Sequence, residues 1–421
     1  MHSEETMKTL PLAGLRVLDL ASDRGFLCGK ILGEIGADVI KIELPGGEPS
    51  RRLGPFYHDA LRPESSLSWF ALNTNKRGIT LNLESADGRE IFRRMAAKAH
   101  FVVESFDPGY LDAMGLGYKD MAALNPGIIV TSITPYGQTG PYSHFKGSDL
   151  STTALSGFLY LVGDADRPPV RISFPQAYLH AGLEAAAGTM VANCWREMSG
   201  EGQHVDVSIQ RCLCLLLTSS MRYYEASGRL VKRVGISAGA RTAGGNSPRS
   251  IYPTKDGYFD FCLYGGAVGA HSNREMVKWM ADEGMAPPTI VAKDWDSFDM
   301  ATASQEELDE IAAAVGQFFL KHDTAELYEG ALKRGIMAYP VNTVKDIAAD
   351  PQLKERDFWV DIEHEDLGAT ITYPGSPLRM FGAETPMRRA PLIGEHNEDI
   401  YAGELGFTEK EMLLLKQSGT I

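Results

Sequence analysis

The sequence has little positive charge and no long apolar stretch. Its 421 residues include 41 lysines and arginines against 55 aspartates and glutamates, a formal net charge of −14 at pH 7. Nucleic acids and anionic membranes bind basic surfaces, so this balance argues against both as partners. The densest apolar run, CLCLLL at 212–217, is far shorter than the roughly 20 residues of a membrane span. The opening MHSEETMKTLPLAG has no apolar core, so we expect no secretory signal.

Cysteine is also scarce. Cys28, Cys194, Cys212, Cys214 and Cys262 show none of the CxxC spacing that is typical of metal sites. They lie among apolar residues, as buried and reduced thiols do in cytoplasmic proteins. We therefore predict a cytoplasmic protein that holds no metal.

Strand-like and helix-like segments alternate in the first half of the chain. LRVLDLA (15–21) and ADVIKIE (37–43) are short apolar runs that suit buried parallel strands, and residues 26–36 between them have helical spacing. The same rhythm continues to GIIVTSIT (127–134). Repeated strand–helix–strand units predict an α/β class, with a Rossmann-like, doubly wound parallel sheet.

Three glycines in the first strand–helix unit could suggest a dinucleotide site. Gly25, Gly29 and Gly33 are spaced by four residues, which does not fit GxGxxG. We expect close helix packing to be their role.

The pattern changes after about residue 225. Glycine, serine and turn signals then dominate, with short strands such as GYFDFCLYG (257–265), and helical segments follow to about 335. We predict a large α/β domain with its N-terminal part at 1–225, a smaller α+β domain at 226–335, and a C-terminal segment at 336–421 that rejoins the large domain.

A set of motifs follows in a fixed order along nearly the whole chain. They are LAGLRVLDLA (12–21), LNTNKRGITLNL (72–83), FVVESFDPGYLDAMGLGY (101–118), LNPGIIVTSITPYGQTGPY (124–142), REMSGEGQHVDVSI (196–209) and APLIGEHNEDIYAGELGFTEKEM (390–412). This series resembles the class III CoA-transferases, the superfamily of formyl-CoA transferase, carnitine CoA-transferase and acyl-CoA racemase. The resemblance implies an α/β large domain with a smaller domain, two interlocked chains, and transfer of CoA between carboxylic acids. Coenzyme A thioester would be a substrate, and no cofactor would be bound permanently.

The resemblance also implies a nucleophile that this chain lacks. In the family, an aspartate attacks the donor thioester and passes through an anhydride to an enzyme-bound CoA thioester. Matching the motif places that aspartate at Tyr178, four residues before Gly182, and a shift of one or two residues gives Ala177 or Gln176. None of these is a carboxylate, and a tyrosine with a pKa of about 10 cannot carry CoA as a thioester.

Two other acids come into question for the missing role. Glu184 lies about 9 Å further along a helix and off the first face, so it is a weak candidate. Asp149 matches an acid that is structural in the family. Racemases of the family carry a histidine just before that acid, and here the residue is Ser148. Racemase activity is therefore not expected.

The resemblance implies a CoA site that is altered in part. Leu44 and Ala113 stand where members often carry basic residues, which weakens the expected clamp on the CoA phosphates. The residues that still match CoA-binding positions are Asn75, Lys76, Arg77, Ser105, Phe106, Lys146 and Arg51, with Arg52 beside the last. For the basic ones, a solvated turn or fold-stabilising ion pairs are the alternative.

An intact fold without the nucleophile suggests the non-catalytic subunit of a heteromeric CoA-transferase. Its partner would be a homologous subunit with the aspartate, in a heterodimer or heterotetramer. The opening ASDRGFLCGK (21–30) resembles the non-catalytic chain of two-subunit members that move CoA from succinyl-CoA to benzylsuccinate. Two alternatives stay open: a self-sufficient transferase using another carboxylate such as Glu184, and a non-enzymatic scaffold.

Overall fold

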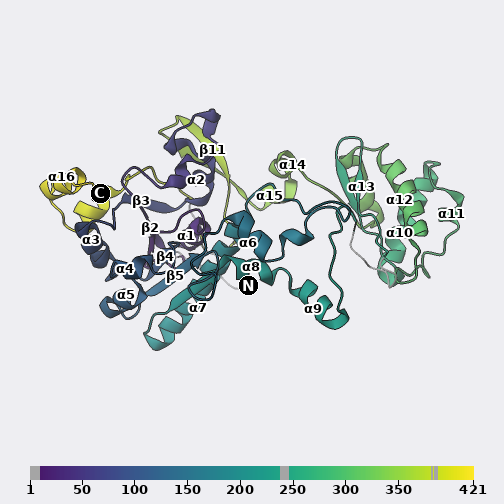
Figure 1. Ribbon diagram of the computed structural model, residues 1–421. Coiled ribbons are helices and arrows are strands. Elements are labelled where there is room, and N and C mark those ends of the chain that lie inside the picture. The colour runs from purple at the N-terminus through teal and green to yellow at the C-terminus, as the bar shows by residue number, and fades with distance from the viewer. Residues whose placement is uncertain (1–9, 238–245, 381–382, 384–386) are drawn as a thin grey trace, which may run out of the picture. The chain divides into compact units, whose positions relative to one another are not determined.

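The structure is a computed structural model that describes residues 10–237, 246–380, 383 and 387–421. The chain forms two compact units (Figure 1). The large unit comprises Met1–Phe158, Ile172–Thr218 and Lys354–Ile421, and the small unit comprises Leu159–Arg171 and Ser219–Leu353. The small unit begins and ends outside the range 226–335 expected from the sequence, and it takes in a short earlier segment.

A six-stranded parallel sheet forms the centre of the large unit. Its strands are β1 (Arg16–Asp19), β2 (Asp38–Glu43), β3 (Lys76–Thr80), β4 (Phe101–Glu104), β5 (Ile129–Thr134) and β6 (His204–Ser208). The order across the sheet is β3-β2-β1-β4-β5-β6, and every neighbouring pair is parallel. The predicted α/β class is confirmed. The order reverses between β1 and β4, and ligands of such sheets bind at the carboxyl ends of the strands at this point.

The helices of the large unit follow the strands as the sequence predicts. They are α1 (Phe26–Glu34), α2 (Leu67–Leu72), α3 (Ala86–Ala96), α4 (Tyr110–Ala113), α5 (Tyr118–Leu124), α6 (Asp149–Leu155), α7 (Ala177–Ser199), α8 (Ile209–Leu215) and α16 (Glu409–Gln417), with a π-helix at Glu398–Glu404. A separate two-stranded antiparallel sheet joins β10 (Trp359–His364) to β11 (Ala369–Pro374). Short 3₁₀ turns lie at Pro49–Arg52, Tyr57–Asp59 and Pro63–Ser65.

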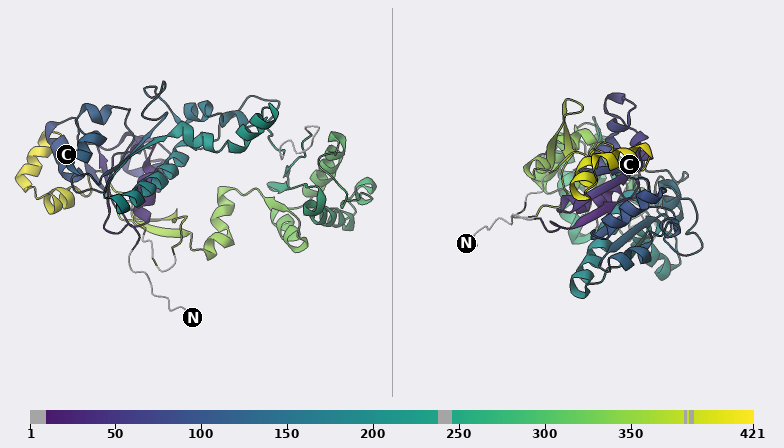
Figure 2. Two further views of the ribbon diagram at one scale, coloured as in Figure 1. Left: turned by 90° about the horizontal axis from the view of Figure 1, so that it is seen from below. Right: turned by 90° about the vertical axis from the view of Figure 1, so that its left-hand side faces the viewer.

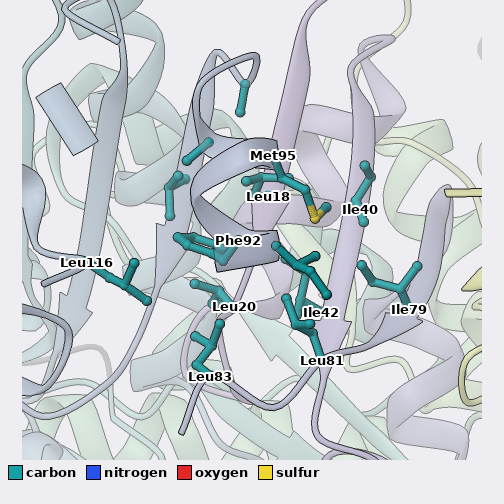
Figure 3. Packing of buried hydrophobic residues seen from close by; sticks show 14 of the residues in the cluster. Leu18, Leu20, Ile40, Ile42, Ile79, Leu81, Leu83, Phe92, Met95 and Leu116 are labelled. Carbon is teal, nitrogen blue, oxygen red and sulfur yellow. The ribbon is translucent and has the colours of Figure 1, made fainter. Parts of the chain in front are cut away.

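Apolar side chains cover both faces of the central sheet. On one face, Phe92 and Met95 of α3 pack toward Leu18 and Ile40 of the strands (Figure 3). The C-terminal segment joins this core through Met412, and α16 lies beside α3 (Figures 1 and 2). The opposite face packs against α1 and α7. Burial on both faces explains why the strands are continuous apolar runs.

The small unit is built around a three-stranded antiparallel sheet of order β7-β8-β9. Its elements are β7 (Ile251–Pro253), β8 (Tyr258–Phe261), β9 (Ala338–Pro340), α10 (Gly266–Asp282), α11 (Pro288–Val291), α12 (Gln305–Phe319), α13 (Thr324–Arg334) and α14 (Val344–Ala349). At the limits between the units lie α9 (Thr218–Ser227) and α15 (Pro351–Glu355), and Leu159–Leu161 forms a 3₁₀ turn. The core of the small unit contains Phe318, Phe319 and Trp279. No helix within the described ranges is long and apolar enough to cross a membrane.

A buried ion pair joins the sheet to α1. The carboxylate of Asp19 is fully buried at the end of β1, 2.7 Å from Nζ of Lys76 and 3.7 Å from Nζ of Lys41. Nζ of Lys76 also donates to the carbonyl of Phe26, the first residue of α1, at 2.9 Å. A side chain at Gly29 would overlap the Asp19 carboxylate, which explains this glycine as a site of close packing.

Burial opposes the ionisation of Asp19. The two ammonium groups outweigh that effect and hold the pKa of this carboxyl below its usual 3.8. Because the pKa is lowered in the folded state, the stabilisation is present at neutral pH and is lost only as the pH falls below that range.

Replacing Asp19 tests this interaction. We expect Asp19→Asn to lower the free energy of unfolding by about 3–5 kcal/mol, because it leaves two buried ammonium groups without their counter-charge. Urea unfolding followed by circular dichroism at pH 7 measures the loss. The matched control is Asp107→Asn, which breaks the exposed pair with Lys146 and should cost below about 1 kcal/mol. Equal losses for the two variants would contradict the assignment.

Candidate functional site

The predicted nucleophile position lies in the first turn of α7. The helix begins at Ala177, whose amide donates to Oδ1 of Asp149 at 2.8 Å, so this carboxylate fixes the start of the helix. One turn later, a side chain at Gly182 would overlap Leu27 of α1. The close approach of α7 to α1 therefore fixes where Tyr178 lies.

Tyr178 belongs to a half-buried polar cluster with two residues from the loop after β1. Arg24 forms a hydrogen bond with the Tyr178 side chain and donates to the carbonyl of Gly147 at 3.3 Å. Burial and the nearby charge of Asp23 raise the pKa of the Tyr178 hydroxyl. Burial also raises the pKa of Asp23, and Arg24 opposes that shift. A carboxylate is thus close to Tyr178, contributed by a different element.

Our sequence reasoning did not single out Asp23 and Arg24. The available signal was a charged pair inside an altered opening motif, directly after the strand at which the sheet order reverses. Glu184, by contrast, is exposed on α7. Burial, with the charge of Glu184, raises the pKa of the Cys212 thiol on α8 to about 11. Glu184 therefore lies near α8, and it is no part of the cluster at Tyr178.

The loop after β4 carries two of the predicted CoA-binding residues. Oγ of Ser105 accepts from the amide of Ser22 at 2.8 Å, and the two hydroxyls lie 2.9 Å apart. The ring of Phe106 stacks on Tyr110 with centroids 4.7 Å apart. These contacts tie the loops after β1 and β4 together at the carboxyl edge of the sheet, where the strand order reverses.

Lys146 lies in the same region. Its ammonium forms an ion pair with Asp107, which follows Phe106 directly, and its side chain is 82% exposed. Among the predicted CoA-binding cations, this one is therefore accessible to a phosphate. Ser105, Phe106 and Lys146 are brought together by the fold.

Asn75, Lys76 and Arg77 lie at the amino end of β3, opposite the edge that carries Ser105. Lys76 is buried on Asp19, and Arg77 pairs with Asp38 and Glu404 at 2.7 Å each. The side chain of Asn75 accepts from the amide of Arg388 at 2.7 Å. These contacts favour the fold-stabilising alternative, and CoA binding by the three residues stays a prediction. They line a pocket of about 210 Å³ with Arg388, Arg389, Pro391, Glu395 and His396.

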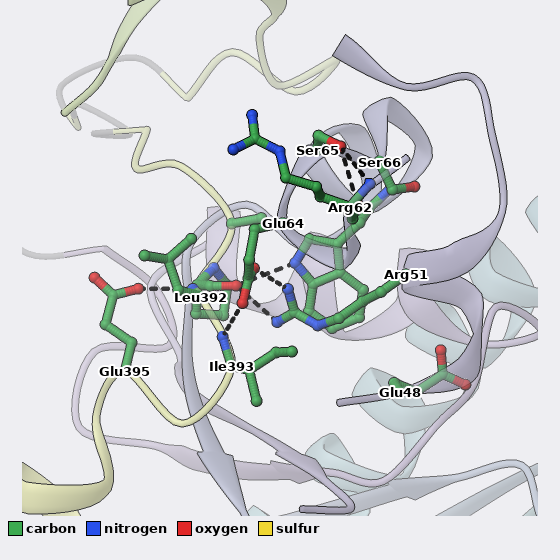
Figure 4. A network of polar contacts seen from close by, with 12 residues as sticks. Glu48, Arg51, Arg62, Glu64, Ser65, Ser66, Leu392, Ile393 and Glu395 are labelled. Atoms are coloured by element: carbon green, nitrogen blue, oxygen red, sulfur yellow. Dashed lines mark hydrogen bonds and ion pairs between the residues drawn. The ribbon is translucent and has the colours of Figure 1, made fainter. Parts of the chain in front are cut away.

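Arg51 is also held within the protein (Figure 4). Its guanidinium contacts both carboxylate oxygens of Glu43 at 2.6 and 2.8 Å, Glu64 at 2.7 Å and the carbonyl of Pro391 at 2.8 Å. It stacks 3.7 Å above the ring of Trp69, and only 1% of the residue is exposed. A guanidinium with this many partners stabilises the packing of several segments, so its role in CoA binding also stays a prediction. Within the described residues, no group of three or more histidine, cysteine or acidic side chains could hold a metal ion.

Comparisons with known proteins place this geometry in a family. Residues 12–397 match the model of CoA-transferase family III. The chain is 34% identical over 412 residues to succinyl-CoA:(R)-benzylsuccinate CoA-transferase subunit BbsE of Thauera aromatica, covering 96% of this chain and 97% of that protein. It is 29% identical over 428 residues to the succinyl-CoA–L-malate CoA-transferase beta subunit of Chloroflexus aurantiacus, covering 99% of each.

A solved structure agrees with these relatives. The crystal structure of a CaiB/BaiF family protein from Brucella suis is 32% identical and superposes with a TM-score of 0.80, covering 94% of this chain and 100% of that chain. The match extends over both compact units. The chain belongs to CoA-transferase family III.

Proposed function

We propose that this chain is the non-catalytic subunit of a heteromeric CoA-transferase that moves CoA from succinyl-CoA to benzylsuccinate. One observation carries the proposal: a member of this family has Gln176, Ala177 and Tyr178, and no carboxylate, at the start of α7. The similarity to a benzylsuccinate CoA-transferase subunit supports the substrate pair. The similarity to a second protein that is named as a subunit supports a multi-subunit enzyme.

The proposed partner is a homologous chain with the aspartate, interlocked with this one. Its carboxylate would attack the thioester carbonyl, with CoA thiolate as leaving group, to give a mixed anhydride. The thiolate would then attack the enzyme acyl carbon and release succinate, leaving an enzyme–CoA thioester. The acceptor acid would reverse these steps. In this chain, Ser105, Phe106 and Lys146 are the residues that we propose to contact CoA.

One face of α7 supports association with a related chain. Exposed apolar side chains follow one side of this helix at Leu183, Val191, Trp195 and Met198. Val191 and Met198 lie two turns apart, with Trp195 between them, and they are 71% and 77% exposed. An exposed apolar patch on a helix is typical of an interface.

A second candidate function is a self-sufficient transferase that uses another carboxylate. Asp23 favours it, because its charge acts on Tyr178 in the half-buried cluster described above. Glu184 has less support, since it is exposed near α8. A non-enzymatic scaffold is the remaining alternative.

Trapping the CoA thioester tests the proposal. The chain alone, and the chain co-expressed with its homologous subunit, are incubated with succinyl-CoA, reduced with borohydride and digested for mass spectrometry. Borohydride converts a side-chain CoA thioester to an alcohol, so the nucleophile is marked by its mass. We expect no reduced acid in this chain and a reduced aspartate in the partner.

Variants of this chain make the trap decisive. Tyr178→Asp places a carboxylate at the family position, and we expect it to become labelled if that position faces the thioester. Asp23→Asn is the matched control for the second candidate. Reduced Asp23 or Glu184 in the unaltered chain would contradict the non-catalytic assignment. If neither subunit is labelled, the result favours a non-enzymatic scaffold.

Introducing positive charge on α7 tests the interface. We expect Val191→Lys combined with Met198→Lys to weaken association with the homologous subunit at least tenfold, because two ammonium groups would be buried without counter-charges. Light scattering after size-exclusion chromatography measures the assembly, and circular dichroism checks the fold. Glu90→Lys, exposed on α3, should leave assembly unchanged. Full assembly of the α7 variant would exclude this face as the interface.

A further inference from the structure

A buried acid lies directly before the loop that carries Ser105 and Phe106. Glu104 is the last residue of β4, and only 5% of it is exposed. Within the described part of the chain, this carboxylate forms no ion pair. The family comparison and the mechanism proposed above leave this residue without a role.

Hydrogen bonds hold the Glu104 carboxylate between two strands and the loop. Its Oε2 accepts from the amide of Phe106 at 2.7 Å, and the hydroxyl of Ser132 on the neighbouring β5 donates to the same carboxylate. Ser132 is in turn 2.9 Å from Nε2 of His204 on β6, and Tyr118 stacks on that imidazole with centroids 5.4 Å apart. The amide that positions Phe106 is therefore bound by an acid that is itself held in place.

The surroundings of Glu104 are rich in negative charge. Asp112 of α4 and Asp206 of β6 act on it, and Asp107, Lys119 and His204 line the pocket of about 170 Å³ that borders it. Burial, with the two acids, raises the pKa of Glu104 to about 7, against the hydrogen bonds from Ser132 and Phe106. The pocket gives the carboxyl a route to exchange protons.

We propose that Glu104 is a positioning residue for the CoA site, whose ionised carboxylate fixes the amide of Phe106 and holds the Ser105–Phe106 loop in its binding conformation. This inference rests on the proposed function, because it takes that loop as part of the CoA site. A hydrogen bond to a carboxylate is stronger than one to a neutral acid, so protonation of Glu104 loosens the loop. The loop then has to be ordered again when CoA binds.

The sign of the effect follows from proton linkage. A carboxyl whose pKa is raised by folding binds more protons in the folded than in the unfolded state, so it lowers stability as the pH rises from about 4.5 to 7. Because CoA binding requires ionised Glu104, protonation of this carboxyl competes with binding. The affinity for CoA therefore falls as the pH drops below 7. One coupled proton permits a loss of up to about tenfold between pH 8 and pH 6.

Hydrogen exchange of the ligand-free chain tests the loop directly. Glu104→Gln keeps an acceptor for the Phe106 amide and removes the charge, so it imitates the protonated acid. After correction for the intrinsic rate, we expect amides at 105–110 to exchange faster at pH 6 than at pH 8 in the unaltered chain. In Glu104→Gln they should exchange fast at both pH values. The exposed Glu84→Gln, near Tyr110, is the matched control and should behave as the unaltered chain.

Titration with CoA tests the consequence at the site. The dissociation constant is measured by calorimetry at pH 6 and pH 8 with the full chain, with and without its homologous partner. The dissociation constant at pH 6 divided by that at pH 8 should be up to about tenfold larger for the unaltered chain than for Glu104→Gln. Titration of the CoA phosphate is common to both proteins, so it cancels in this comparison.

The two measurements separate the possible failures. If neither the unaltered chain nor Glu104→Gln binds CoA, the proposal that this chain contacts CoA is wrong. Hydrogen exchange then still decides the role of Glu104. If Glu104→Gln keeps the pH dependence of exchange and of binding, the role of Glu104 is overturned. Thermal melting at pH 8 checks the fold, and there Glu104→Gln should be at least as stable as the unaltered chain, since the ionised acid is the costly form.

Discussion

The large unit depends on the carboxylate of Asp19, buried between the ammonium groups of Lys76 and Lys41. Those three side chains come from three adjacent strands, and Lys76 also binds the first carbonyl of α1. One carboxylate thereby holds the sheet and the first helix in register. The loop between β1 and α1, which carries Asp23 and Arg24, starts from this fixed point.

The basic residues that match family motifs have two different environments in this chain. Lys76, Arg77 and Arg51 meet carboxylates of the chain itself, and a buried guanidinium or ammonium that already has its hydrogen bonds gains little from a ligand. Lys146 is exposed and meets one exposed aspartate, which a phosphate can displace. A motif match therefore reports inherited folding constraints together with ligand contacts.

The start of α7 is tied to two other segments of the large unit. Arg24 binds Tyr178, Asp23 acts on both, and Asp149 still fixes the start of α7 as a structural acid can. The start of α7 and the loop after β1 thus share one polar cluster. In the loop after β4, the amide of Phe106 donates to the carboxylate of Glu104. The fold is that of the family, and the start of α7 carries a tyrosine in a polar cluster in place of a carboxylate.

The sequence by itself determined the α/β class, the parallel strands and the family, because apolar runs and motif order are local properties of the chain. It also fixed the absence of a carboxylate at 176–178. It could not separate Lys146 from Lys76, or show that Asp23 acts on Tyr178, since such contacts join residues 39 or more positions apart. Only the tertiary structure decided which charges are buried on each other and which reach solvent, and burial is what turns Glu104 from an ordinary acid into one that titrates near neutrality.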